Sequence, residues 1–120
     1  MPELALSEAI ADAVSVRAQD RPVTAACVRI GYLRQVVPDA LTFAWSMITA
    51  ESALDGCELV IEHVPAVVRC RACGTDTTLT APVMVCGECG ATDVEPLTGD
   101  EFLLVSIEFA AESTESNGVP

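Results

Sequence analysis

Four cysteines in two pairs constrain this chain more than any other feature. Each pair has the form Cys-x-x-Cys-Gly, with Cys70 and Cys73 in the first and Cys86 and Cys89 in the second. Two cysteines three positions apart can present both sulfurs to one ion, and the glycine permits a positive φ that turns backbone N–H groups toward the thiolates. Four thiolates about 2.3 Å from the metal form a closed tetrahedral zinc site. We therefore predict that these four cysteines bind one structural zinc ion.

Two other interpretations of the cysteine pairs stay open, namely a pair of disulfides and an iron site of the rubredoxin type. A catalytic zinc is not expected, because four cysteine ligands leave no position for water. The linker over 74–85 has room for a short hairpin through 77–80 and 82–85. The whole module is too small for a core of its own, so we expect zinc to hold it together.

Net charge narrows the classes of partner. The 120-residue chain carries a net charge of −12, and all six of its basic residues are arginine. Nucleic-acid binding depends on clustered lysine and arginine that neutralise phosphates, so the charge argues against nucleic acid and against anionic membranes. We expect a basic protein surface or a metal cation instead.

The sequence predicts neither a membrane span nor a secretory signal. No segment approaches the roughly 18 uninterrupted apolar residues of a membrane span. Glu3 and Glu8 stand where a secretory signal would carry lysine or arginine. We therefore expect a cytoplasmic protein, in which cysteines stay reduced. Cys27 and Cys57, which stand apart from the pairs, are expected in the core.

Hydrophobic periodicity and turn residues divide the chain into two helices and three strands. The predicted elements are helices over 4–19 and 38–50 and strands over 23–30, 58–64 and 101–109. The fold class is therefore α+β, a small sheet of about three strands with two helices, plus an inserted four-cysteine zinc-ribbon module. The second helix opens with Pro38 and Asp39, which suit a first helical turn. It is apolar almost all round, so we expect burial on more than one side, between the sheet and the first helix, or also against a partner.

The cysteine module interrupts the α/β part of the chain. Residues 1–66 and 101–111 are predicted to form one domain, and residues 67–100 an inserted zinc-binding domain. The strands on either side of the insertion are expected to pair in one sheet. The polar tail over 112–120 has little to bury and is predicted to be disordered. A monomer and a homodimer both remain possible.

Two further patterns, taken with the cysteine pairs, point to a family. The chain begins Met-Pro-Glu-Leu-Ala-Leu over 1–6 and carries Gly-x-Leu-x-x-Val-x-Pro-Asp-x-Leu-x-Phe over 31–43. In this order, over residues 1 to about 110, the chain resembles the HypA/HybF family of nickel metallochaperones in [NiFe]-hydrogenase maturation, some of which also serve urease. The resemblance implies a nickel-binding α/β domain and a zinc domain inserted before the last strand.

The resemblance also implies a nickel site at the extreme N-terminus, formed here by Met1, Pro2 and Glu3. Family members carry histidine at position 2, whereas Pro2 has neither an imidazole nor, within a peptide bond, an N–H. Imidazole and amide nitrogens suit divalent nickel, so we expect a weakened or absent site. Three explanations stay open: loss of nickel binding with docking retained, a weaker site formed by the Pro2 amine and Glu3 after removal of Met1, or a substitute ligand such as His63. Glu3 and His63 also have plain structural interpretations, as a helix-start acid and a surface residue.

No catalytic constellation is evident, so we predict that the protein is not an enzyme. The single histidine has no evident cysteine or serine partner, and no glycine-rich phosphate loop is present. The resemblance implies that GTP hydrolysis belongs to a HypB-type GTPase, and that this chain binds that GTPase and the hydrogenase large subunit. Two alternatives are a zinc-ribbon adaptor without metal transfer and a zinc ribbon that binds nucleic acid, which the charge disfavours.

Overall fold

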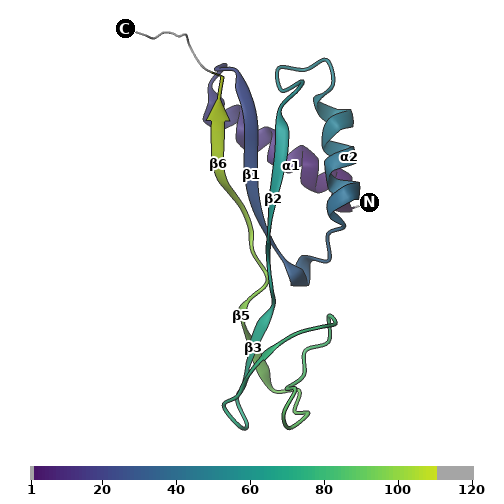
Figure 1. The fold of residues 1–120 in the computed structure, drawn as a ribbon, viewed down its shortest axis with the longest axis vertical. Coiled ribbons are helices and arrows are strands. Elements are labelled where there is room, and N and C mark those ends of the chain that lie inside the picture. Colours follow the sequence, from purple (N-terminus) through teal and green to yellow (C-terminus); the bar gives the residue numbers. More distant parts are fainter. Residues whose placement is uncertain (1, 111–120) are drawn as a thin grey trace, which may run out of the picture. The chain divides into compact units, whose positions relative to one another are not determined.

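The structure, a computed structural model, describes residues 2–110; Met1 and residues 111–120, which include the predicted tail, lie outside the described residues. The elements are α1 (Pro2–Ala18), β1 (Val23–Gly31), the 3-10 helix η1 (Tyr32–Arg34), α2 (Pro38–Thr49), β2 (Glu58–Val64), β3 (Val67–Cys70), β4 (Asp76–Thr78), β5 (Val94–Thr98) and β6 (Phe102–Phe109) (Figure 1). The predicted α+β class is confirmed. Within the described residues, no helix is long and apolar enough to cross a membrane.

Helix α1 buries one face along its length. Ile10, Val14 and Ala18 are almost fully buried, at the i, i+4, i+8 spacing that aligns side chains on one side of a helix. The Ser7 hydroxyl is also buried and donates to the Leu4 carbonyl at 2.8 Å, so its burial leaves no unpaired donor. Helix α1 packs against α2, and Figure 1 shows it crossing behind β1.

The first sheet has the strand order β2-β1-β6. The strands that flank the insertion, β2 and β6, lie in one sheet as predicted, but they do not pair with each other, because β1 lies between them. Strand β1 is buried along most of its length, with Ala26, Val28 and Ile30 each 2% exposed or less. The outer strands β2 and β6 alternate between more and less exposed residues. Ala26, Val28 and Ile30 lie on one face of β1, and the residues between them, on the opposite face, are half-buried. The central strand is therefore covered fully on one face and partly on the other.

Helix α2 is buried on one face only, so its expected burial between the sheet and α1 was wrong. Leu41, Ala44 and Trp45 are buried, and the indole N–H of Trp45 donates to the Cys57 carbonyl at 2.8 Å. Phe43 and Met47, on another face, are 66% and 60% exposed. Contact of this second face with a partner stays a prediction.

The second sheet has the order β4-β3-β5, with both outer strands antiparallel to β3. The predicted hairpin between 77–80 and 82–85 was wrong: β4 pairs with β3, and residues 79–93 contain no strand. Bonds from the Val83 amide to the Ala81 carbonyl (2.7 Å) and from the Val85 amide to the Val83 carbonyl (3.0 Å) make tight turns there. Pro82 between them offers no N–H to a strand ladder.

The chain divides into two compact units. The first contains the described parts of 1–28, 37–60 and 104–120, and the second contains 29–36 and 61–103. The cysteine module was expected to be too small for a core of its own, but the second unit has one, formed by Ala66, Val68, Cys70, Leu79, Cys86 and Val94. Tyr32, Leu33, Met84 and Ala91 pack against this core. Glycine at position 31 permits the close approach of this segment to Gly99, because a Cβ on Gly31 would lie 2.1 Å from the Gly99 carbonyl carbon. The domain bounds at 67 and 100 stay a prediction. The second unit also contains residues 29–36, 61–66 and 101–103.

Candidate metal centre

All four predicted zinc ligands come together in the second unit. The Cys70 and Cys89 sulfurs lie 3.6 Å apart, the Cys73 and Cys86 sulfurs likewise, and all four lie within 4.8 Å of one another. A tetrahedron with metal–sulfur bonds of about 2.3 Å has edges of about 3.8 Å. The cluster is therefore compatible with a structural zinc ion, and its four thiolates fill the coordination sphere.

The first cysteine pair forms a tight turn at the end of β3. The amides of Ala72 and Cys73 point at the Cys70 sulfur, at 3.3 and 3.4 Å. The Gly74 amide donates to the Cys70 carbonyl at 2.9 Å, and its φ of +79° closes the turn. We call residues 70–74 the first knuckle.

The second pair repeats this geometry. The amides of Glu88 and Cys89 lie 3.3 and 3.4 Å from the Cys86 sulfur, and the Gly90 amide donates to the Cys86 carbonyl at 3.0 Å. Gly90 has a φ of +76°. We call residues 86–90 the second knuckle. The prediction that both glycines adopt positive φ and turn amides toward sulfur is confirmed.

Each knuckle has one buried and one exposed cysteine. Cys70 and Cys86 are each 2% exposed, whereas Cys73 and Cys89 are exposed. The N–H groups of Cys89 and Glu88 lower the pKa of Cys86 to about 6. The N–H of Cys73 lowers the pKa of Cys70 in the same way. Both buried sulfurs are thus held toward the thiolate form that zinc requires.

Different groups anchor the two knuckles. In the first, the Arg71 guanidinium pairs with Asp93 at 2.9 Å and with Glu95 at 3.4 Å. In the second, the Gly87 amide donates to the Thr77 hydroxyl at 3.0 Å. Spacing alone did not reveal these anchors, since each joins residues at least ten positions apart.

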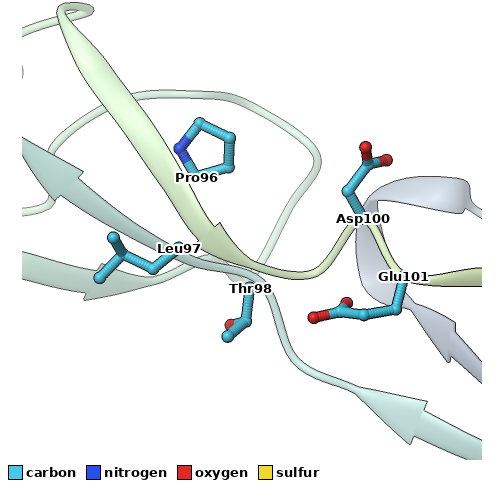
Figure 2. A pocket seen from close by; sticks show the side chains of 5 residues that line it. All are labelled: Pro96, Leu97, Thr98, Asp100 and Glu101. Carbon is cyan, nitrogen blue, oxygen red and sulfur yellow. The ribbon is translucent and has the colours of Figure 1, made fainter.

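Apart from the cysteine cluster, this unit has a hollow of about 310 Å³ that is lined by Pro96, Leu97, Thr98, Asp100 and Glu101 (Figure 2). Its two acids are already engaged: Asp100 pairs with Arg34 at 3.5 Å, and Glu101 accepts from the Gly99 amide at 2.8 Å. Figure 2 shows their carboxylates pointing in different directions. Within residues 2–110, the cysteine cluster is the one group of three or more histidine, cysteine, aspartate or glutamate side chains that lie close enough together to share an ion.

Of the three predicted nickel ligands, the structure describes the side chain of Glu3 alone. Glu3 lies in the first turn of α1, as expected, yet it is only 5% exposed. Its Oε2 accepts from the Val37 amide at 3.2 Å, and no group among the described residues donates to its buried Oε1. This tie to the start of α2 was missed, although Glu3 continues the Ser7–Ile10–Val14 stripe at helical spacing.

The remaining singled-out residues have structural roles. Exposed His63 stacks edge-on against Tyr32, with ring centroids 6.2 Å apart. Cys57 is buried as predicted, and burial raises the pKa of its thiol. Cys27 is only partly buried, so its placement in the core was only partly right.

The family model for hydrogenase/urease nickel incorporation metallochaperones, HypA, matches residues 1–109. The chain belongs to the HypA family. Among its relatives, the hydrogenase maturation factor HypA of Desulfosudis oleivorans is 46% identical over 81 residues, 68% of this chain and 70% of the relative. The HypA of Geotalea uraniireducens is 36% identical over 108 residues, 90% of this chain and 98% of the relative.

Solved HypA structures share the fold. The solution structure of the Ni metallochaperone HypA from Helicobacter pylori matches with a TM-score of 0.63 at 21% identity, over 92% of this chain and 98% of that one. A second HypA solution structure matches with a TM-score of 0.57 at 23% identity, over 90% and 94% of the two chains. These likenesses establish the fold of this HypA family member.

Proposed function

We propose that this chain is a hydrogenase maturation factor, a nickel metallochaperone that assists nickel insertion into a [NiFe]-hydrogenase. The observation that carries the proposal is the family match over residues 1–109, which includes both the N-terminal region and the cysteine module. The relatives named above are hydrogenase maturation factors of similar length.

The four cysteines Cys70, Cys73, Cys86 and Cys89 hold the resident zinc ion. Their sulfur separations, and the amides directed at the two buried sulfurs, support this assignment. Four sulfur ligands leave no open position, so zinc stabilises the unit and transferred nickel binds elsewhere.

Nickel binds weakly at Met1, Pro2 and Glu3. Pro2 removes the imidazole and amide nitrogens that a nickel site would use. Glu3 supplies one carboxylate oxygen without a donor, while its other oxygen is engaged by Val37. His63 remains a candidate substitute ligand.

The partners are proteins of the hydrogenase maturation machinery, specifically a HypB-type GTPase and the hydrogenase large subunit. Its proposed role is to bind and pass on metal and not to catalyse a reaction, and the four thiolates of the described cluster leave its metal no open position for a substrate. We place it in the cytoplasm, where the thiols stay reduced for zinc.

The deciding experiment measures zinc and nickel together on untagged protein with its native N-terminus, for the wild type and for Pro2→His. We expect one zinc ion per chain in both proteins, weak nickel binding in the wild type and tighter binding in Pro2→His. Pro2→Ala serves as the control, since it restores an N–H without an imidazole. If no variant binds nickel, and the wild type binds neither the GTPase nor the large subunit, the metallochaperone assignment is wrong.

Pro2 favours one alternative, an adaptor that keeps the fold and docks partners without transferring nickel. This alternative predicts normal partner binding with no nickel bound by the wild type. Transfer of nickel from the loaded wild-type protein to the hydrogenase large subunit would exclude it.

A further inference from the structure

The unit that contains α1 and α2 exposes an apolar surface where the two helices begin. Leu4, Phe43 and Met47 are 44%, 66% and 60% exposed. They border a hollow of about 260 Å³ that, among the described residues, is lined by Glu3, Leu4, Ala40, Phe43, Ala44 and Met47. We call these six residues the N-terminal patch. Clustered exposed apolar side chains of this kind mark interaction surfaces more often than scattered ones do.

Glu3 gives the patch a polar anchor with an unfinished set of hydrogen bonds. Its side chain is more than nine-tenths buried, and Oε2 is held by the Val37 amide at 3.2 Å. No donor among residues 2–110 reaches Oε1. A buried carboxylate oxygen without a donor is costly, and an incoming cation would relieve that cost.

The charge around the patch is negative and is not balanced by the arginines of this unit. Asp39 lies in the first turn of α2, close in sequence to Ala40 in the lining. The arginines of the unit are Arg17 and Arg21, of which Arg17 lies in the last turn of α1. At a rise of about 1.5 Å per residue, Arg17 is roughly 20 Å along the helix from Glu3. The patch therefore combines apolar surface with acidic side chains that, among the described residues of this unit, no arginine is shown to pair with.

We propose that the N-terminal patch docks an amphipathic segment of a partner protein. Apolar side chains of that segment cover Phe43 and Met47, as in helix-in-groove recognition, and an arginine or lysine reaches Oε1 of Glu3. The exposed Phe43 ring can also make a cation–π contact with that arginine or lysine. The proposal depends on this surface and not on nickel transfer, so either can fail without the other. A nickel ion and a partner's cation would occupy Oε1 in turn.

The test uses two synthetic amphipathic peptides of about 14 residues, long enough for marginal helicity. One combines leucine with arginine, the other leucine with glutamate, and each is titrated into the zinc-loaded full chain at moderate salt. Backbone NMR signals locate the binding. We expect the leucine–arginine peptide to shift the signals of the patch, and the leucine–glutamate peptide to leave them unchanged.

Three variants sharpen the assignment. Phe43→Ser with Met47→Ser should weaken the leucine–arginine peptide about tenfold, since two exposed apolar side chains leave the interface. Glu3→Gln keeps an acceptor for the Val37 amide but removes the charge, and should weaken it about fivefold. Val16→Ser is the matched control, because Val16 is an apolar residue of α1 that is 74% exposed and outside the patch. Thermal unfolding checks that every variant stays folded.

Four results would overturn the proposal. Equal binding of both peptides would show that charge plays no part in recognition, and equal weakening by Val16→Ser would show attachment to any exposed apolar surface. A concentration-dependent dimer that Phe43→Ser abolishes would assign the patch to a second copy of the chain. Shifts of the patch signals on deletion of residues 111–120, without peptide, would assign it to the chain's own terminus.

Discussion

The two knuckles have the same local geometry but different surroundings. In both, two amides lie 3.3 and 3.4 Å from the buried sulfur, and a glycine of positive φ closes the turn. The first knuckle continues from β3, the central strand of its sheet, and Cys70 pairs in register with Val94. The second follows a segment without strands and is tied back through Thr77. The Cys-x-x-Cys-Gly code therefore shapes the turn, while the surroundings determine how firmly each turn is held.

The largest expected effect is that of zinc removal, which should separate the knuckles. Structural zinc contributes about 10–16 kcal/mol of binding free energy in small zinc modules. After chelation, amides over 86–90 should exchange hydrogen faster than those of Cys70 and β3, which keep partial protection from the sheet. Hydrogen exchange with mass spectrometry, before and after chelation under reducing conditions, measures this. Equal loss of protection in both knuckles would contradict the difference in anchoring.

The glycines test the similarity of the knuckles. Gly74→Ala and Gly90→Ala should each lower the free energy of unfolding by about 1–2 kcal/mol, because alanine is strained at positive φ. An added Cβ would meet no atom within 4 Å at either position, so the two costs should be equal. Gly56→Ala is the control: Gly56 has a φ of +83° and equally open surroundings outside both knuckles. It should reduce stability similarly without reducing zinc affinity, whereas unequal effects of the two knuckle variants would refute their equivalence.

Acidification should act through the buried sulfurs. Amides hold the folded pKa of Cys86 at about 6, below its ordinary value of 9.0, so the thiolate stabilises the zinc-free folded state. This stabilisation is complete above pH 9, and it is lost as the pH falls through 6. Thiolate absorbance of zinc-free, reduced protein should show a step near pH 6 that Cys86→Ser removes. Persistence of that step in Cys86→Ser would assign it to another thiol.

The anchors should have the smallest effects. Thr77→Val removes the acceptor for the Gly87 amide and should cost about 1 kcal/mol. Arg71→Gln removes two exposed ion pairs and should cost about 0–1 kcal/mol. Zinc dissociation, followed with a colorimetric chelator, should accelerate more in Thr77→Val, because the second knuckle has no sheet to support it. Thr78→Val, on the same strand, is the control, and faster release from Arg71→Gln than from Thr77→Val would reverse the comparison.

Local features of the sequence predicted well, and long-range features did not. The spacing and glycines of the cysteine pairs predicted the cluster, because a knuckle is closed by bonds within five consecutive residues. The alternation over 58–64 likewise predicted the extent of β2. The central place of β1 and the one-sided burial of α2 depend on which distant segments arrive beside them. The periodicity within a segment does not predict which distant segments will pack against it.

For the proposed nickel ligands, the sequence did not predict the environment of Glu3. The departure at Pro2 was visible from the residue type alone. The bond from the Val37 amide to Glu3 was not predicted, because it joins the start of α1 to the residue before α2. The stripe that Glu3 shares with Ser7 and Ile10 was the available signal, and an acid in such a stripe points to a buried hydrogen bond.

The close approach of Gly31 to Gly99 has a consequence for folding during synthesis. The cysteine-containing unit includes residues 29–36, which precede α2 in the sequence. The Gly31 amide donates to the Glu101 carbonyl at 2.8 Å, and the Leu33 amide donates to the Gly99 carbonyl at 2.7 Å. Residues 29–36 therefore leave the ribosome long before their partners exist. Contacts between such distant positions slow folding, because the loop must close before they form. Until residue 101 emerges, Tyr32 and Leu33 have no completed unit to pack against, even if all four cysteines have already been synthesised.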